Sequence, residues 1–160
     1  MPAAPDGGEQ HELVSSTSAD LSKLSARGKA RKKALDILFE AEQRGDNAVA
    51  LLEQRIAAPT TQTPLPDYTV QIVRGVVGNW VAINEALTTY SRDWPLDRMP
   101  SVDRALLRGA AWELIYNDEI DDPVVISEAV RLAGALSTEQ SPKFVGGLLN
   151  KLAAVKQTLV

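Results

Sequence analysis

The chain has 160 residues, a formal net charge of −4 and no cysteine. This length suits one domain with a tail, and it can bury a core without disulfides or metals. The lack of cysteine excludes a disulfide framework and thiolate metal ligands. No apolar run reaches the roughly 18 residues of a membrane-spanning helix, and the N-terminus lacks the pattern of a secretory signal. We therefore expect a soluble, cytoplasmic protein without a membrane segment.

The first 25 residues contain Pro, Gly, Ser, Thr and acidic residues, with few bulky apolar side chains. Such a segment cannot bury enough apolar surface to offset the entropy of ordering, so residues 1–25 are predicted to be disordered. The acidic residues of this tail precede a basic stretch, which leaves two interpretations open. The tail is either inert and solvated, or it folds back and competes with an anionic ligand.

The rest of the chain shows apolar residues at helical spacing, and no segment alternates with a period of two. A proline-rich loop is expected over residues 58–66. The pattern predicts an all-α bundle of six or seven helices in one domain, residues 26–157. The predicted helices cover residues 29–43, 47–57, 67–91, 102–117, 122–136 and 141–156.

Polar residues and glycine mark the expected helix ends. Gly45 is predicted to end the first helix in a left-handed conformation, and Asp46 to cap the second. Ser101, Asp122 and Ser141 are the predicted caps of the last three helices. Short connections between the helices follow from this spacing.

One pair of glycines resembles a nucleic-acid motif. Gly75-Val76-Val77-Gly78 has the GxxG outline of an RNA-clamping loop. Such a loop needs exposed polar residues between its glycines, whereas here they are two valines inside a predicted helix. Close packing of this helix against a neighbour is therefore the favoured interpretation.

Catalytic chemistry has little support in the sequence. The single histidine, His11, lies in the tail, so with no cysteine the usual nucleophile–base pairs cannot form. Glu113 and Glu128 lie in apolar helical stretches and are either an acid–base pair or, more simply, structural links. In the second case Arg104, Arg108 or backbone donors pair with them, because buried charges persist only when paired. We predict no enzyme, catalytic residue, cofactor or metal site.

A basic cluster lies at the start of the first predicted helix. Its position disfavours cations, because they repel one another and meet the positive end of the helix dipole. A phosphate backbone would relieve both conflicts, although a solvated helix face is the alternative. The five cations of this cluster, with no carboxylate between them, are Arg27, Lys29, Arg31, Lys32 and Lys33.

Lys143 and Phe144 form a second candidate site in the first turn of the last predicted helix. Val145, Leu148 and Leu149 already supply the apolar stripe of this helix, so Phe144 lies to its side. An exposed aromatic ring beside a cation suits base stacking with single-stranded RNA, whereas ordinary core packing is the alternative.

Five stretches, in order, are similar to the NusB family. Together the match covers about residues 26–155, and the ordered set is more specific than any one stretch. The stretches read ARGKARKKALDILFEAE from Ala26, YTVQIVRGVVGN from Tyr68, VDRALLRGAAWELIY from Val102, PVVISEAVRLA from Pro123 and SPKFVGGLLNKLA from Ser141.

The resemblance implies a transcription antitermination factor that binds boxA RNA of ribosomal RNA operons. It implies two partners, a ribosomal small-subunit protein acting as NusE and an RNA polymerase complex. The arginine-rich motif of the family maps onto Arg27, Lys29 and Arg31, followed by Lys32 and Lys33. Its RNA-contacting aromatic maps onto Phe144 beside Lys143, and its acidic partner-contacting positions map onto Asp97 and Asp103.

Gly28 interrupts the basic run, and lysine replaces arginine at several positions of the motif. Lysine cannot make the bidentate phosphate contacts of arginine, so stronger dependence on the protein partner is expected. Two other functions stay open: a protein–protein scaffold that binds no RNA, and an accessory subunit of an RNA methyltransferase. A homodimer that covers the basic helix is a further alternative.

Overall fold

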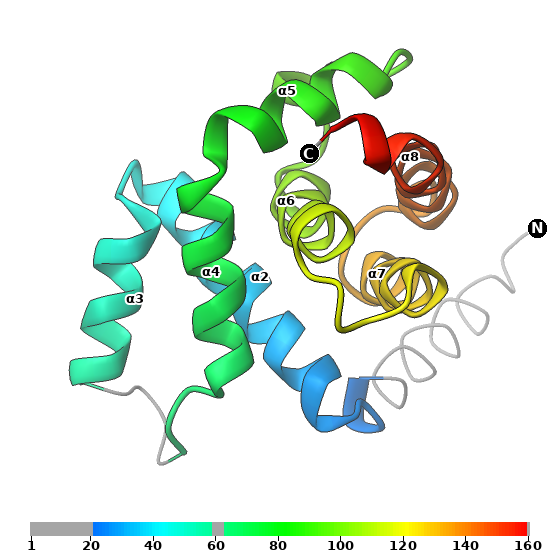
Figure 1. Cartoon of the computed structure of the whole chain (residues 1–160). Helices are drawn as coiled ribbons and strands as arrows, with labels where there is room; N and C mark the ends of the chain where they lie inside the picture. Colours follow the sequence, from blue (N-terminus) through cyan, green and yellow to red (C-terminus); the bar gives the residue numbers. More distant parts are fainter. Residues whose placement is uncertain (1–20, 59–62, 160) are drawn as a thin grey trace, which may run out of the picture.

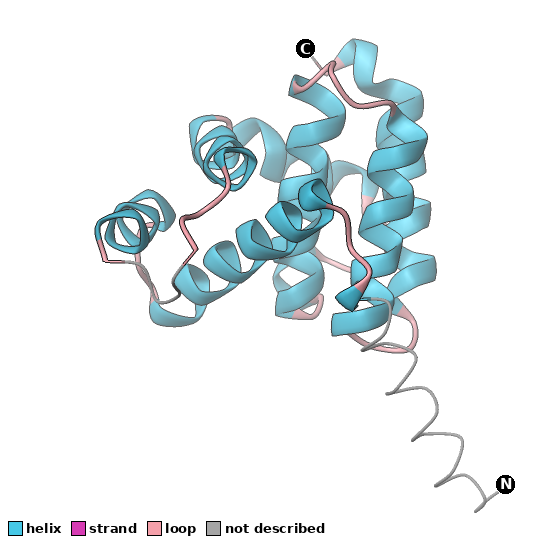
Figure 2. Cartoon of the chain, turned by 90° about the horizontal axis from the view of Figure 1, so that it is seen from below, coloured by secondary structure: helices cyan, strands magenta, loops and turns pink. Residues whose placement is uncertain are grey.

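The computed structural model describes residues 21–58 and 63–159 (Figure 1). Within these ranges the chain forms helices and loops and no strand, which confirms the predicted fold class (Figure 2). Two 3-10 helices, η1 (Leu96–Arg98) and η2 (Lys156–Thr158), accompany the α-helices. The α-helices of the described residues are α2 (Ala26–Arg44), α3 (Ala48–Ala57), α4 (Asp67–Gly78), α5 (Trp80–Tyr90), α6 (Ser101–Tyr116), α7 (Asp122–Leu136) and α8 (Ser141–Val155).

Helix α6 lies at the centre of the bundle and contacts α2, α4, α5, α7 and α8 (Figure 1). It is enclosed because buried residues occur around most of its circumference rather than on one stripe. Leu107 and Leu114 are almost fully buried on it. Helices α7 and α8 pack against each other and against α6. The position of α6 allows its two ends to hold different functional surfaces.

The predicted helix over residues 67–91 is wrong in one respect, because the chain turns at Asn79 and forms two helices. The backbone N–H of Asn79 donates to Gly75 and Val76, and its side-chain amide donates to the carbonyl of Gly75 at 2.8 Å. Gly78, a poor helix former, precedes this turn. The turn lets α4 pack against α2 and α3 while α5 reaches α8.

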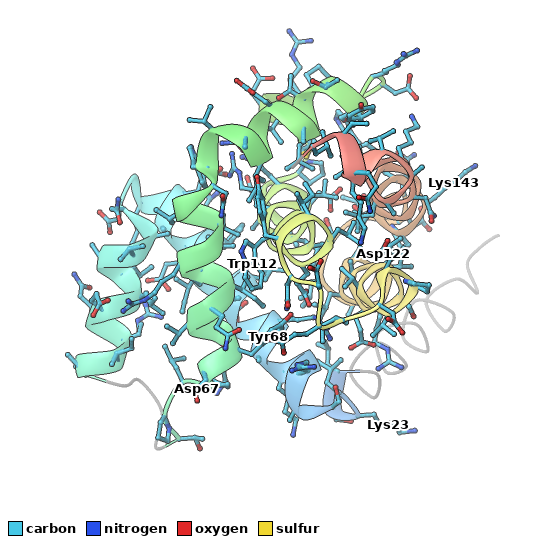
Figure 3. The ribbon with its side chains drawn as sticks, viewed as in Figure 1. Lys23, Asp67, Tyr68, Trp112, Asp122 and Lys143 are labelled. Atoms are coloured by element: carbon cyan, nitrogen blue, oxygen red, sulfur yellow. The ribbon has the colours of Figure 1, made fainter. Side chains whose placement is uncertain are left out.

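Gly75 allows the close helix packing that the sequence predicts. A Cβ atom at this position would lie 2.0 Å from the indole nitrogen of Trp112, so a side chain cannot fit here. Trp112 on α6 therefore packs directly against the backbone of α4 (Figure 3). Of the two glycines in the GxxG sequence, Gly75 is therefore the one required for helix packing.

The predicted tail, residues 1–25, includes residues that pack against the core of the domain. Leu24 is buried in the core, and Leu21 packs against the same core. The side chain of Leu24 lies beside Gly28, where α2 approaches α7. The prediction of disorder for residues 1–20 lies outside the described residues.

The helix caps differ from the prediction by one residue in several places. Gly45 has φ 71°, the predicted left-handed end of α2. Asn47, rather than Asp46, caps α3, because its Oδ1 accepts from the backbone N–H groups of Val49 and Ala50. Ser141 lies in the first turn of its helix instead of capping it. The predicted caps Ser101 and Asp122 likewise lie in the first turns of α6 and α7. Among the described helices, none is long and apolar enough to cross a membrane.

Candidate nucleic-acid interface

The start of α2 carries the basic cluster, and the helix separates its members onto two sides. Ser25 caps this helix by accepting a 3.0 Å hydrogen bond from the N–H of Gly28. Arg27 and Arg31 are one helical turn apart and face Tyr68, whereas Lys29 and Lys33 lie on the other side. The five cations are therefore not one continuous surface patch.

Arg31 belongs to the protein core, which corrects its prediction as a surface residue that contacts RNA. Only 7% of it is exposed, and its Nε and Nη2 atoms each lie 2.9 Å from a carboxylate oxygen of Glu113. Glu128 lies 3.6 Å away on the other side of the guanidinium group. These contacts occupy Arg31 because it lies at the border of the apolar stripe, where α6 and α7 cover it.

Glu113 is the centre of a buried hydrogen-bond network. The hydroxyl of Tyr68 donates to Glu113 at 2.6 Å and accepts from the amide of Asn117 at 2.9 Å. Burial and the hydrogen bond to Glu113 raise the pKa of Tyr68. Burial acts to lower the pKa of Arg31, but the hydrogen bond and charge of Glu113 outweigh it and raise that pKa. The network joins α2, α4 and α6 and keeps Arg31 charged.

Arg27 lies on the surface above this network. Its guanidinium carbon is 4.8 Å from the centre of the Tyr68 ring, and one Nη atom lies 3.9 Å from Glu119. About half of the Arg27 side chain is exposed. A guanidinium group that rests on an aromatic ring is held in place while its other face stays available to an anion.

The three lysines of the cluster differ in whether they form an ion pair with a carboxylate. Lys32 pairs with Asp36 at 2.9 Å on the same helix. Lys29 is exposed and Lys33 is half-buried, and neither forms an ion pair with any described residue. Lys29 and Lys33, with Arg27, are therefore the members of the cluster that can meet a phosphate group. Arg27 and Lys29 lie in the first turn of α2, whose N–H groups also attract anions, and Lys33 lies one turn further along the helix.

Gly28 interrupts the basic run for a structural reason. A Cβ atom at this position would lie 3.1 Å from Oε1 of Glu128 and 3.1 Å from Leu24. The backbone of α2 approaches α7 closely here, so a long cation at residue 28 would have to displace its neighbours. The glycine therefore marks a helix contact rather than a gap in a surface motif.

The second candidate site lies at the start of α8. Lys143 is exposed and forms no ion pair within residues 21–58 and 63–159, and Phe144 is half-buried. The ring of Phe144 meets that of Trp94 edge to face, with 5.0 Å between ring centres and 65° between planes. Phe144 packs partly against the core and also lines an open depression, and its stacking with RNA bases stays a prediction.

Trp94 was not among the residues predicted from the sequence. It lies between α5 and η1, next to Pro95, and with Arg92 it lines an open depression beside Lys143 and Phe144. The sequence signal that indicates this residue is an aromatic side chain in a short connection next to a proline. Only the packing of this connection against α8 brings the two rings together.

The two candidate surfaces are anchored at opposite ends of α6. Arg31 pairs with Glu113 near the end of α6, whereas Ser141 donates to Asp103 near its beginning. Glu113 and Asp103 are ten residues apart, so a rise of 1.5 Å per residue separates these anchoring contacts by about 15 Å. A ligand that contacts both surfaces must therefore be extended.

The two predicted partner-contacting acids differ. Asp97 is exposed in η1. Asp103 is fully buried, which corrects its prediction as a surface residue. Its Oδ2 accepts a 2.9 Å hydrogen bond from Ser141, and its Oδ1 is buried with no hydrogen-bond partner. Asp103 is enclosed because the starts of α6 and α8 meet around it, so it links the two helices.

Glu113 and Glu128 are ion-paired, as the structural interpretation expects, but their partners were predicted wrongly. Glu113 pairs with Arg31 instead of Arg104 or Arg108. Both of those arginines bind Glu42 at the end of α2.

Glu42 therefore holds the end of α2 against α6. The hydrogen bond from Arg104 is the largest cause that lowers the pKa of Glu42, against an opposing effect of burial. Within the described parts of the chain, no group of His, Cys, Asp and Glu residues is arranged to hold a metal ion.

Comparison with known proteins agrees with this fold. The family model described as NusB family matches residues 28–154, most of the chain. The chain belongs to the NusB family. The transcription antitermination protein NusB of Arthrobacter sp. (strain FB24) is 54% identical over 137 residues, which cover 86% of this chain and 99% of that protein. NusB of Beutenbergia cavernae is 49% identical over 144 residues, which cover 85% and 94%.

Solved structures of the NusB family share the arrangement of helices. T. maritima NusB superposes with a TM-score of 0.71 at 30% identity, covering 81% of this chain and 92% of that one. A complex of the antitermination factors NusB and NusE with double-stranded RNA gives a TM-score of 0.70 at 24% identity, covering 81% and 96%. At 24% identity, the similarity to the second structure shows a shared fold and no more.

Proposed function

We propose that this NusB-family antitermination factor binds single-stranded boxA RNA of ribosomal RNA operons together with the ribosomal protein NusE. The observation that carries the proposal is a pair of exposed cations, Lys29 and Lys143, at the starts of α2 and α8, neither of which forms an ion pair with a described residue. In a chain of net charge −4, such unpaired cations favour a polyanion. The half-open ring of Phe144 adds a surface for an unstacked base.

The proposed RNA contacts follow from which cations are unpaired or, like Arg27, only loosely paired with a carboxylate. Lys29, Lys33 and Arg27 contact phosphate groups at the start of α2. Lys143 and Phe144 contact the strand at the start of α8. Arg31 supports the Tyr68 platform on which Arg27 lies and makes no phosphate contact. Lys32, which is already paired with Asp36, contributes little.

The proposed protein partner contacts the acidic η1 region. Asp97 is the exposed acid there, whereas Asp103 acts from inside by holding α8. A basic ribosomal protein complements an exposed carboxylate. In the solved complex of NusB and NusE with double-stranded RNA, NusE is the protein bound together with that NusB. Within this proposal, the assembled complex acts on RNA polymerase in the cytoplasm.

The test is a titration of fluorescent boxA RNA with and without NusE across a salt series. We expect the affinity to fall steeply with salt and to rise when NusE is present. Lys29→Ala and Lys33→Ala should each weaken binding and reduce the salt slope by about 0.7, the value for one phosphate contact of a single strand. Phe144→Ala should weaken binding with little change of slope.

Lys32→Ala is the matched control, because it removes a cation of the same cluster that is already paired. Loss of binding equal to that of Lys29→Ala would contradict the assignment of the free lysines. No salt-dependent binding by the parent chain, with or without NusE, would overturn the proposed function and leave the scaffold alternative. Sedimentation at several concentrations tests the predicted homodimer.

A further inference from the structure

A groove runs along α8 beyond Phe144, and the proposed function does not use most of it. Positions 143, 147 and 151 lie one helical turn apart and form a stripe on this helix. The connection between α5 and η1 forms the opposite wall. We call this surface the α8 groove and define it by Arg92, Trp94, Lys143, Phe144, Gly147 and Lys151.

Gly147 is the floor of the α8 groove, and internal packing does not explain it. Apart from its chain neighbours and its own helix backbone, no atom of the described residues lies within 4 Å of a Cβ atom built on Gly147, and the residue is exposed. Gly146, its neighbour, has Val130 at 3.2 Å and thus a packing reason. Glycine is the least favourable helix residue after proline, so an exposed glycine inside a helix is consistent with close approach of a ligand to the backbone.

Two aromatic rings line the groove, Trp94 from the connection between α5 and η1 and Phe144 from α8. Trp94 and Phe144 are both half-buried, and their edge-to-face contact fixes the orientation of each ring. Their centres are 5.0 Å apart, so both rings belong to one local aromatic surface. The platform is ordered before a ligand arrives, because both rings also pack on the core.

The edges of the groove are basic. Arg92, Lys143 and Lys151 are exposed, and none of them forms an ion pair with a described residue. Asp93 is the single carboxylate among the groove-lining residues. This differs from the start of α2, where Arg31 and Lys32 have their own carboxylates. The combination of free cations, two rings and a bare backbone fits a single-stranded nucleic acid.

We propose that the α8 groove holds two consecutive nucleotides of the bound RNA, one base on Phe144 and its neighbour on Trp94. The sugar–phosphate backbone passes over Gly147 toward Lys151. The inference rests on the proposed RNA-binding function and adds the path of the strand and the residues that guide it. Trp94, Gly147 and Lys151 are new binding residues in this assignment.

The decisive experiment compares Gly147→Leu with Gly78→Leu in the full chain, using fluorescent boxA RNA. Both glycines have open space around a built Cβ, but Gly78 lies at the end of α4, away from the groove. Leucine at residue 147 fills the floor without a clash and favours the helix. We expect Gly147→Leu to weaken RNA binding at least tenfold without lowering the melting temperature, and Gly78→Leu to bind like the parent.

Two further variants separate stacking from charge. Trp94→Leu should weaken binding about tenfold with an unchanged salt slope, and Trp94→Phe should restore much of the affinity because it keeps a ring. Lys151→Ala should reduce the salt slope by about 0.7. Circular dichroism and the melting temperature of each variant show that the fold is retained.

The outcomes distinguish failure of the groove assignment from failure of the proposed RNA-binding function. If the parent chain binds RNA, Lys29→Ala weakens it, and Gly147→Leu binds as tightly as the parent, the groove assignment is overturned while the proposed function stands. Equal weakening by Gly78→Leu and Gly147→Leu would also overturn the groove assignment. If the parent binds no RNA, both proposals fail together.

Discussion

The two ends of α6 hold the two candidate RNA surfaces in opposite ways. At its end, Glu113 draws Arg31 out of the basic cluster and into the core. At its beginning, Asp103 binds Ser141 and leaves the adjacent Lys143 free on the surface. The region with more cations in sequence therefore loses part of its charge to the fold. A count of neighbouring cations overestimates a binding surface wherever a buried carboxylate lies within reach.

The largest expected effect comes from breaking the buried pair below α2. Glu113→Leu removes the bidentate partner of buried Arg31 and leaves it only the longer contact with Glu128 at 3.6 Å, which we expect to lower the free energy of unfolding by about 3 kcal/mol. Tyr68 loses its acceptor in the same variant. Urea unfolding followed by circular dichroism measures the change.

The double variant Arg31→Met with Glu113→Leu is the control, because it removes both charges at once. It should recover much of the lost stability and retain the salt slope of RNA binding. A loss below about 1 kcal/mol in Glu113→Leu would show that this pair does not support α2. A reduced salt slope in the double variant would instead assign Arg31 to the residues that contact RNA.

An intermediate effect is expected at the other end of α6. Ser141→Ala removes the hydrogen bond to buried Asp103, and we expect a loss of about 1–3 kcal/mol. Because Ser141 precedes Lys143 and Phe144 in the first turn of α8, RNA affinity should fall while the salt slope stays the same. Thermal unfolding and the RNA titration measure the two effects.

Ser137→Ala is the matched control for this hydroxyl cluster. Ser137 contacts Ser141 at 3.1 Å but has no recorded bond to Asp103, so its removal should cost less. A Ser141→Ala variant with parental stability and parental RNA affinity would show that the Asp103 link does not position α8.

The smallest expected effect concerns the pH dependence of the contact between the end of α2 and α6. The pKa of Glu42 is lowered in the folded state, chiefly by its hydrogen bond with Arg104. The stabilisation is therefore present above the unfolded pKa of about 4.3 and is lost as the pH falls through the lower folded value. Glu42→Gln should be less stable than the parent at pH 7, and the difference should be smaller at pH 3.

Urea unfolding of both proteins at the two pH values measures this difference. Glu53→Gln is a control on the surface, where a single exposed pair with Arg74 contributes little. A constant difference between parent and Glu42→Gln across the pH range would mean that the Glu42 charge does not stabilise the fold.

Much of the fold was predictable, because helix periodicity is a local property. The apolar stripes located α2, α3, α6, α7 and α8, and the left-handed end at Gly45 followed from residue type. The turn at Asn79 was missed because the apolar stripe continues through it. A side-chain bond to Gly75 and the packing of Trp112 divide the helix there.

The candidate site was predictable only in part. Lys143 and Phe144 lie on the surface where the helical spacing placed them, and their role in RNA binding stays a prediction. Trp94 was missed because its contact with Phe144 joins residues 50 positions apart in the chain. Asp103 was assigned to the surface because the approach of α8 cannot be read from the pattern of α6 alone.

The sequence by itself determined the helices, their apolar faces and the membership of the NusB family, since all three depend on local spacing and residue order. The tertiary structure alone decided which cations are free. Arg31 finds Glu113 82 residues away, whereas Lys29, on the same helix, finds no carboxylate among the described residues. The physical reason is that a buried charge needs a partner, and only the packing of helices brings that partner within reach.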